Sequence, residues 1–419
     1  MLFKDLDIIK PILNVLDKQG YKSPTPIQEK AIPSILDWRD ILGAAQTWTG
    51  KTAAFAIPTL QILKREKELW NFSRAIKCLI LTPTRELAIQ IEDNIKQYDS
   101  ELWLRHLVIF GWVNQSSQVR KLKAWVDILV ATPWRLIDLM GQWYVDLKKV
   151  EIFILDEADR MLDMWFINDV KKVQKKLPTK RQTLFFSATM PKEISWLADS
   201  MLDNPVKIEI TPVSSTADTV KQSVFFVSSW NKKHLLAEIL VDEKIKSMLV
   251  FTRTKRGADN VVKDLEKVWV VAQAIHGNKS QNARQRALNN FKSGETRVLV
   301  ATDIAARGID IDSLMYMVNY DISNEPETYV HRIGRTWRAW KDWIAYSFCN
   351  QEEVEYLLDV QKMLWKKISV IIDHPFHIEV DESIKAPKKQ QWRGRRQFSS
   401  KRPSNDNGKR NVRRKKNKR

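Results

Sequence analysis

The chain has 419 residues, of which 44% are hydrophobic, and a formal net charge of +19. This length is enough for two domains with their own cores, and no apolar run approaches the roughly 18 residues of a membrane span. The opening residues MLFKDLDIIK lack the apolar stretch of a secretory signal. Only Cys78 and Cys349 occur, both beside apolar runs, so we expect buried thiols in a reducing, cytoplasmic setting.

Short apolar runs alternate with amphipathic stretches in the first half of the chain. The runs are typical of buried parallel strands, and they lie at 78–83, 126–133, 151–159 and 183–189. A helical pattern over 86–98 lies between the first two of them. This alternation predicts an α/β domain over 1–209, with a parallel sheet covered on both faces and functional loops at the carboxyl ends of the strands.

A second series of the same kind follows a Ser-, Thr- and Pro-rich linker at 210–217. Its apolar runs lie at 223–227, 248–254, 298–303 and 316–321 and predict a second α/β domain over 218–372. The remaining residues, 373–419, form the predicted tail, in which 385–419 hold 16 lysines and arginines against one acid. We expect this tail to be disordered and to bind phosphate backbones without reading sequence.

Two motifs of the first half carry phosphate chemistry. The sequence AQTWTGKT, at 45–52, lies between two apolar stretches, as a phosphate-binding loop does. Lys51 is expected to reach the β- and γ-phosphates, and the Thr52 hydroxyl is expected to hold Mg²⁺. Asp156 and Glu157 end a predicted buried strand, where the first would hold the Mg²⁺ shell and the second would activate the attacking water.

With these motifs in order, residues 1–372 resemble the DEAD-box RNA helicases, and the basic tail is similar to those of the bacterial RhlE-like branch. The segment GYKSPTPIQ, at 20–28, resembles the family's Q motif, in which Gln28 would read the adenine edge and Tyr21 would stack on the ring. The resemblance implies two tandem RecA-like domains that bind ATP and Mg²⁺ between them. The implied ATP-binding residues are Tyr21, Gln28, Ala45, Gln46, Thr47, Thr49, Gly50, Lys51, Thr52, Gly308 and Asp310.

Further motifs fall where the family places its RNA-facing and coupling residues. The implied RNA-binding residues are Pro83, Thr84, Arg85, Gly111, Thr132, Pro133, Arg135, Arg253 and Thr302. The residues implied to couple hydrolysis to strand separation are Asp159, Ser187, Thr189 and His331. The segment HRIGRTWR, at 331–338, implies that Arg335 and Arg338 reach the γ-phosphate as arginine fingers.

The implied function is RNA-stimulated ATP hydrolysis coupled to local unwinding of short RNA duplexes and to remodelling of RNA–protein complexes. Backbone contacts predict low sequence preference. We expect a monomer that binds single-stranded and short duplex RNA, has ribosomes or RNA-degradation complexes as possible partners, and is not bound to a membrane. An ATPase-impaired RNA-binding clamp or annealing chaperone is one alternative, and a DNA-translocating helicase is another.

Tryptophan and glycine usage departs from the family pattern, since the chain has 17 Trp and 12 Gly. Family glycines are replaced at Trp48, Trp112, Trp134, Trp337 and Trp340, and tryptophans also stand where loop or strand-entry glycines are usual, at Trp38, Trp125, Trp165, Trp269 and Trp343. These positions favour an altered form of a natural helicase sequence. Trp48 is expected to crowd the triphosphate and Trp337 to separate the arginine fingers, whereas Trp196 is expected to be a core residue or surface anchor.

Overall fold

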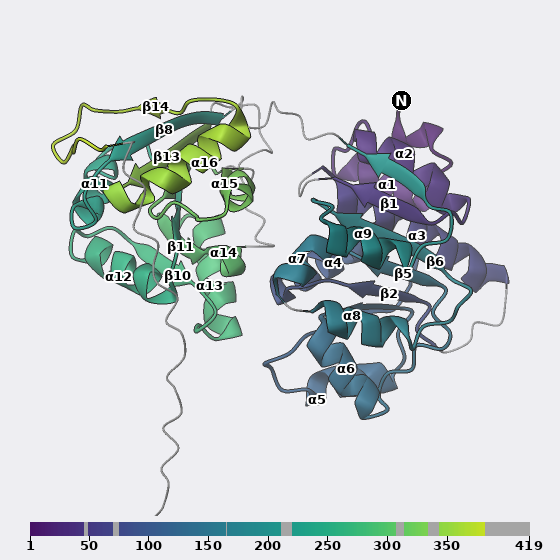
Figure 1. The fold of residues 1–419 in the computed structure, drawn as a ribbon. Coiled ribbons are helices and arrows are strands. Elements are labelled where there is room, and N and C mark those ends of the chain that lie inside the picture. The colour runs from purple at the N-terminus through teal and green to yellow at the C-terminus, as the bar shows by residue number, and fades with distance from the viewer. Residues whose placement is uncertain are drawn as a thin grey trace, which may run out of the picture.

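The computed structural model describes residues 1–45, 49–69, 75–164, 166–210, 220–306, 314–333 and 343–381. Over these ranges the chain forms two units, each built on a seven-stranded sheet (Figure 1). Every pairing within the two sheets is parallel. The two predicted α/β units with parallel sheets are therefore confirmed.

The first sheet has the strand order β3-β4-β2-β5-β6-β1-β7. Its strands are β1 (Ile41–Ala44), β2 (Cys78–Leu81), β3 (His106–Ile109), β4 (Ile128–Ala131), β5 (Ile152–Leu155), β6 (Gln182–Ser187) and β7 (Val206–Glu209). The helices between them are η1 (Phe3–Asp5), α1 (Lys10–Lys18), α2 (Pro26–Leu36), α3 (Lys51–Leu69), α4 (Arg85–Tyr98), α5 (Ser116–Lys123), α6 (Pro133–Gly141), α7 (Ala158–Asp163), α8 (Ile167–Gln174) and α9 (Lys192–Asp199).

The second sheet has the order β10-β11-β9-β12-β13-β8-β14. Its strands are β8 (Val220–Phe226), β9 (Met248–Thr252), β10 (Ala272–Ile275), β11 (Val298–Thr302), β12 (Tyr316–Asn319), β13 (Trp343–Cys349) and β14 (Ser369–Val370). Its helices are α11 (Lys232–Ile239), α12 (Lys255–Glu266), α13 (Gln281–Lys292), α14 (Asp303–Ala306), α15 (Pro326–Ile333), η3 (Gln351–Glu353) and α16 (Val354–Leu364).

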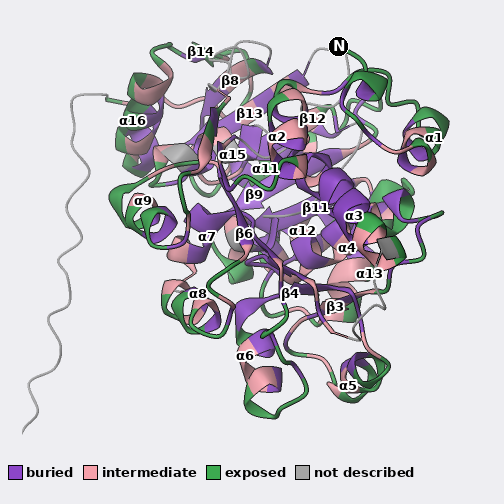
Figure 2. Ribbon diagram, turned by 90° about the vertical axis from the view of Figure 1, so that its right-hand side faces the viewer, coloured by how far each residue is buried: buried purple, intermediate pink, exposed green. Residues whose placement is uncertain are grey.

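The central strands β2, β4 and β5 of the first sheet are buried on both faces, which explains their continuous apolar sequences (Figure 2). Alternate side chains of β5 enter two different cores. Ile152 and Ile154 join one core with helices α3 and α4, whereas Phe153 and Leu155 join the other with α6 to α9. Successive residues of a strand point to opposite faces, so each strand fastens helices on both sides of the sheet.

The second unit extends beyond the boundary expected at residue 372. The Ile378 amide donates to the Phe226 carbonyl over 3.1 Å, and Phe376 packs against the core of the unit. Part of the segment 373–381, which the sequence assigns to the tail, therefore lies beside the end of β8, where Val227 and His377 form an isolated antiparallel bridge. The linker and tail at 211–219 and 382–419 lie outside the described residues.

Both cysteines are buried and unpaired, as predicted, and burial raises the pKa of each thiol well above its ordinary value. Among the helices of the described ranges, none is both long enough and apolar enough to cross a membrane.

Seven tryptophans adopt the left-handed backbone conformation that favours glycine. They are Trp38, Trp103, Trp112, Trp125, Trp143, Trp269 and Trp365, with φ between 52° and 64°. Trp134 and Trp343 do not, because they lie in α6 and β13, and Trp196 is an exposed residue of α9 rather than a core residue. Trp48, Trp165, Trp337 and Trp340 lie outside the described residues.

Candidate active site

A cavity of about 330 Å³ opens at the carboxyl ends of β1 and β5 in the first unit. This is the edge of a parallel sheet at which α/β proteins bind ligands. Its lining includes seven of the predicted site residues, namely Tyr21, Gln28, Gly50, Lys51, Thr52, Asp156 and Glu157. Its other lining residues were not among the predicted site residues, and they are Ser23, Thr25, Ala53, Leu87, Gln90, Asn94 and Tyr98.

Lys51 begins α3 directly after the phosphate-binding loop and is the strongest indication of an anionic ligand. Its side chain is buried, and within the described part of the chain its ammonium has no hydrogen-bond partner. The carboxylates of Asp156 and Asp159 interact with its charge, but neither of them accepts its hydrogen bonds. A buried ammonium with unsatisfied donors is costly, so the cavity favours a further anionic acceptor. The amide groups at the start of a helix favour the same kind of ligand.

Asp156 and Glu157 follow β5 and are both buried at the base of the cavity. Burial raises the pKa of Asp156 to about 6, with the neighbouring Glu157 acting in the same direction and Lys51 acting against it. Glu157 has φ 54° and forms an ion pair with Arg160. A non-glycine residue held in this conformation beside a buried carboxylate is typical of a functional site.

Three residues predicted to couple hydrolysis to strand separation lie together behind this pair. One oxygen of Asp159 accepts hydrogen bonds from the Thr189 amide and hydroxyl, at 2.8 and 3.0 Å. The Asp159 amide donates to the Ser187 hydroxyl at 3.2 Å. Burial alone would raise the pKa of Asp159, but Lys51, Arg160 and the Thr189 bonds together lower it. The end of β5 is thereby joined to the end of β6.

Gln28 fastens the phosphate-binding loop to the start of α2. Its side-chain oxygen accepts from the Thr25 amide at 2.9 Å, and its side-chain nitrogen donates to the Gly50 carbonyl at 3.1 Å. The Thr25 hydroxyl donates to the Thr49 carbonyl at 2.8 Å. Thr25 therefore belongs to the site, and its signal in the sequence was the capping-box spacing to Gln28.

Replacing Gly50 with alanine is expected to weaken both the loop and the fold. Gly50 has φ 88°, and a Cβ atom there would lie 2.9 Å from the Thr25 hydroxyl and closer still to the Gln28 amide. We expect Gly50→Ala to lower the free energy of unfolding by roughly 2–3 kcal/mol. Gly294→Ala is the control, because Gly294 has φ 83° and open space around it. Equal losses for both variants, measured by urea unfolding, would contradict the predicted clash.

The loops predicted to face RNA occupy the ends of β2, β3 and β4, which are neighbouring strands. Thr84 caps α4 by accepting from the Leu87 amide, and Thr132 precedes α6. Pro83 and Pro133 are buried beside them. The Arg135 guanidinium is buried and donates to the Gln118 side chain and the Val113 carbonyl, so it braces the 111–118 loop instead of facing solvent.

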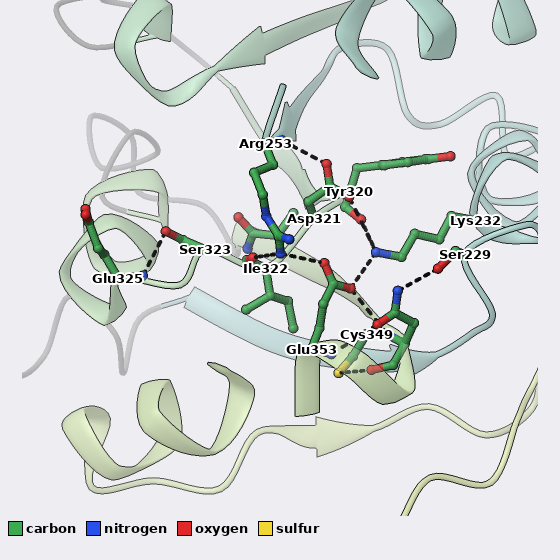
Figure 3. Close-up of polar contacts among 12 residues, drawn as sticks. Ser229, Lys232, Arg253, Tyr320, Asp321, Ile322, Ser323, Glu325, Cys349 and Glu353 are labelled. Atoms are coloured by element: carbon green, nitrogen blue, oxygen red, sulfur yellow. Dashed lines mark hydrogen bonds and ion pairs between the residues drawn. The ribbon is translucent and has the colours of Figure 1, made fainter. Parts of the chain in front are cut away.

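In the second unit, Arg253 extends from the end of β9 and is anchored by acids (Figure 3). Its amide donates to Asp321, and its guanidinium donates to Glu353 at 3.0 Å and to the Ile322 carbonyl at 2.8 Å. Lys232 supplies the second positive charge of the cluster, with its ammonium 2.6 Å from the other Glu353 oxygen. The part-exposed Arg253 is thus held in one orientation at the sheet edge.

Thr302 is buried at the end of β11, and the following Asp303 receives a bidentate ion pair from Arg332. Arg332 also donates to Asn319 and to the Asp321 carbonyl, so it joins the ends of β11 and β12. The sequence analysis did not single out Arg332. Several predicted residues lie outside what the structure describes, namely Gln46, Thr47, Gly308, Asp310, Arg335, Arg338 and the side chain of His331.

The two units meet at one polar junction beside the predicted RNA-facing loop. Arg284 forms a 3.0 Å ion pair with Glu86, and Gln281 donates to the same carboxylate at 3.1 Å. Arg85 donates to the Gln281 side-chain oxygen at 3.3 Å. The start of α4 in one unit therefore contacts the start of α13 in the other.

Comparisons with known proteins agree with this geometry. Residues 25–197 match the family described as DEAD/DEAH box helicase, and residues 231–340 match the family described as helicase conserved C-terminal domain. The ATP-dependent RNA helicase CshA of Listeria monocytogenes is 39% identical over 87% of this chain and 69% of its own length. The DEAD-box ATP-dependent RNA helicase RhpA of Helicobacter pylori is 37% identical, over 88% and 73%. The structure of S. cerevisiae Dbp5 bound to RNA and ADP BeF3 has a TM-score of 0.76 at 27% identity, covering 88% and 95%.

Proposed function

Because this chain belongs to the DEAD-box ATP-dependent RNA helicases, we propose that the cavity holding Lys51, Asp156 and Glu157 is where it hydrolyses ATP. The observation that carries the proposal is the buried Lys51 ammonium without a hydrogen-bond partner among the described residues. A polyphosphate supplies the anion that this ammonium lacks, and the amides at the start of α3 add further donors. Gln28 and Tyr21 line the same cavity and would receive the adenine ring.

Each residue has a defined role in the proposed hydrolysis. Lys51 binds the β- and γ-phosphate oxygens and offsets their charge. Glu157 orients the attacking water and accepts its proton, and Arg160, paired with one of its carboxylate oxygens, holds that carboxylate in place. The Asp159–Thr189 hydrogen bonds link this event to β6 and so to the remainder of the sheet. Arg335 and Arg338 are proposed to complete the site from the second unit.

The residues of the cavity suit Mg²⁺. In the described ranges no group of three or more His, Cys, Asp or Glu side chains could hold a metal ion, and Mg²⁺ typically uses only one or two protein carboxylates together with substrate phosphates. Asp156 and the Thr52 hydroxyl are the proposed ligands, both at the cavity wall. When bound, Mg²⁺ would neutralise charge on the phosphates.

We propose that RNA lies across the ends of β2 and β4 in the first unit and β9 in the second. Thr84, Arg85 and Thr132 would contact its phosphates from one side, and Arg253 from the other. These contacts do not read bases, so the protein would unwind short duplexes with little sequence preference. The domains are proposed to span 1–209 and 218–381, the second including the segment after residue 372 that contacts β8, in a cytoplasmic monomer.

Steady-state ATP hydrolysis with and without single-stranded RNA tests the proposal. The chain is compared with a variant in which Trp48 and Trp337 are both changed to glycine, and with Glu157→Gln. We expect RNA to stimulate hydrolysis and the double glycine variant to be roughly tenfold faster or more, since glycine allows backbone to approach the phosphates. Glu157→Gln should remove the RNA-stimulated hydrolysis.

Three other results would change the conclusion. If the rate of ATP hydrolysis is the same with and without RNA, in both the chain and the glycine variant, the helicase assignment of this cavity is contradicted. Folded protein that binds RNA but hydrolyses no ATP in either form would favour an RNA-binding clamp. A strict requirement for a deoxy strand would favour a DNA translocase.

A further inference from the structure

Two tryptophan rings stack at the edge of the first sheet. Trp112 follows β3, Trp134 is the second residue of α6 after β4, and these two strands are hydrogen-bonded neighbours. Their ring centroids are 6.2 Å apart, with 27° between the ring planes. Gly111 permits this approach, because a Cβ atom there would lie 3.0 Å from the Trp134 ring.

The pair stays open to solvent although the rings cover one another. Trp112 is 83% exposed and Trp134 is 56% exposed. Within the described residues, Trp112 and Trp134 stack on each other, whereas Trp143, which is also exposed, has no ring partner. The edge of the first sheet therefore carries a paired aromatic surface that is open to solvent.

One cation lies beside the pair, and the helix that follows Trp112 in the chain carries others. The Arg85 guanidinium carbon lies 6.0 Å from the Trp112 ring centroid. The next helix, α5, carries the exposed cations Arg120, Lys121 and Lys123. Aromatic rings beside cations are the combination by which proteins bind single-stranded nucleic acid, the rings stacking on bases and the cations contacting phosphates.

We propose that the outer face of the Trp112–Trp134 pair is a stacking site for one nucleobase of single-stranded RNA. The base adds to the outside of the pair, since rings 6.2 Å apart are already in direct contact. This inference rests on the proposed RNA-directed function and adds to it a base contact that phosphate contacts cannot supply. It gives the protein a preference for strands with free, unpaired bases at this position.

Equilibrium binding to two labelled oligomers tests the site, using fluorescence anisotropy without nucleotide. One probe is a uridylate octamer, and the other is the same ribose-phosphate chain without bases. Both probes carry the same phosphates, so electrostatic binding by the basic tail cancels in their ratio. We expect the full chain to bind the uridylate octamer about tenfold more tightly than the abasic one.

The variants decide whether the pair is responsible. Trp112→Gly with Trp134→Gly should bring the ratio of affinities close to one, whereas Trp112→Phe with Trp134→Phe should keep most of it. Trp143→Gly is the matched control, because Trp143 is 93% exposed, has φ 64° and lies in the same unit; it should leave the ratio unchanged. An unchanged ratio in the double glycine variant, or equal binding of both probes by the full chain, would overturn the stacking site alone. Failure to bind either probe would overturn the RNA-directed function as well.

Discussion

Replacing four tryptophans that follow helices with glycine is expected to raise the free energy of unfolding by about 2–4 kcal/mol in total. The four are Trp38, Trp143, Trp269 and Trp365, which come after α2, α6, α12 and α16. After each of them, the next amide donates to the carbonyl five residues earlier, the hydrogen bond that closes a helix through a left-handed residue. Glycine is the residue that adopts this conformation without strain.

The chain contains its own example of the glycine version. Gly20 follows α1 with φ 76°, and the Tyr21 amide donates to the Leu16 carbonyl at 3.0 Å. A side chain in this conformation costs roughly 1–2 kcal/mol, and the greater freedom of glycine in the unfolded chain offsets about 0.5–1 kcal/mol of the gain. Trp143, Trp269 and Trp365 are almost fully exposed, so little packing is lost with the ring.

Trp196→Gly is the control for this prediction, because the same change should there have the opposite sign. Trp196 lies inside α9, does not have positive φ and is 68% exposed. Glycine within a helix should lower the free energy of unfolding by roughly 0.5–1 kcal/mol. Urea unfolding followed by far-ultraviolet circular dichroism measures both effects. A four-site variant that unfolds at the same urea concentration as the parent would show that these positions are not strained.

The sequence predicted these tryptophans only in part, for a physical reason. Family glycines pointed to Trp38, Trp112, Trp125 and Trp269, and all four have positive φ. Trp103, Trp143 and Trp365 have the same conformation without such a signal. For Trp143 and Trp365 the reason is that a helix end is not recognisable without its hydrogen bonds. Trp134 and Trp343 stand where the family or a strand entry usually has glycine, but their backbone is not left-handed. Glycine is also used where the backbone must approach another group closely, so a glycine position does not always indicate positive φ.

The apolar runs of the sequence predicted the fold, but they did not predict which residues surround the site. The four runs of the first half correspond to β2, β4, β5 and β6, which end two to four residues earlier than their runs because the polar ends form loops. The strands β3 and β10 were missed, since their short sequences HLVI and AQAI show no long apolar run. Asn94 and Tyr98 reach the cavity from α4, and Arg135 turns inward; both depend on packing between elements distant in sequence.

Sequence motifs also did not predict Arg332 or the cluster of charged residues around Lys232. A single lysine at the start of a helix is expected to be exposed to solvent, but Lys232 is only 2% exposed. Its ammonium lies 2.6 Å from Glu353, 2.7 Å from the Tyr320 carbonyl and 3.6 Å from Asp321. The partners come from β12, η3 and the residues after them, more than eighty positions away, and only the folded sheet brings them together (Figure 3).

Lys232→Met is expected to lower the free energy of unfolding of the second unit by about 3–5 kcal/mol. Glu353 is buried, and burial raises its pKa while Lys232 opposes that rise. Without the ammonium, the Glu353 carboxylate keeps Arg253 as its one remaining cationic partner in the cluster. Removing one member of a buried pair costs more than the pair itself contributes, because the other charge is left without compensation.

Two further variants separate this explanation from a general loss of packing. Lys233→Met, at the exposed neighbouring position, should change the free energy of unfolding by no more than about 0.5 kcal/mol. Lys232→Met combined with Glu353→Leu should recover most of the loss, since both charges are then absent. The loss in Lys232→Met should also shrink as the pH falls, because a group whose pKa is raised by folding favours the folded state once it is protonated. A loss that is independent of pH and persists in the double variant would mean that the methylene packing of Lys232, and not its charge, stabilises the end of β12.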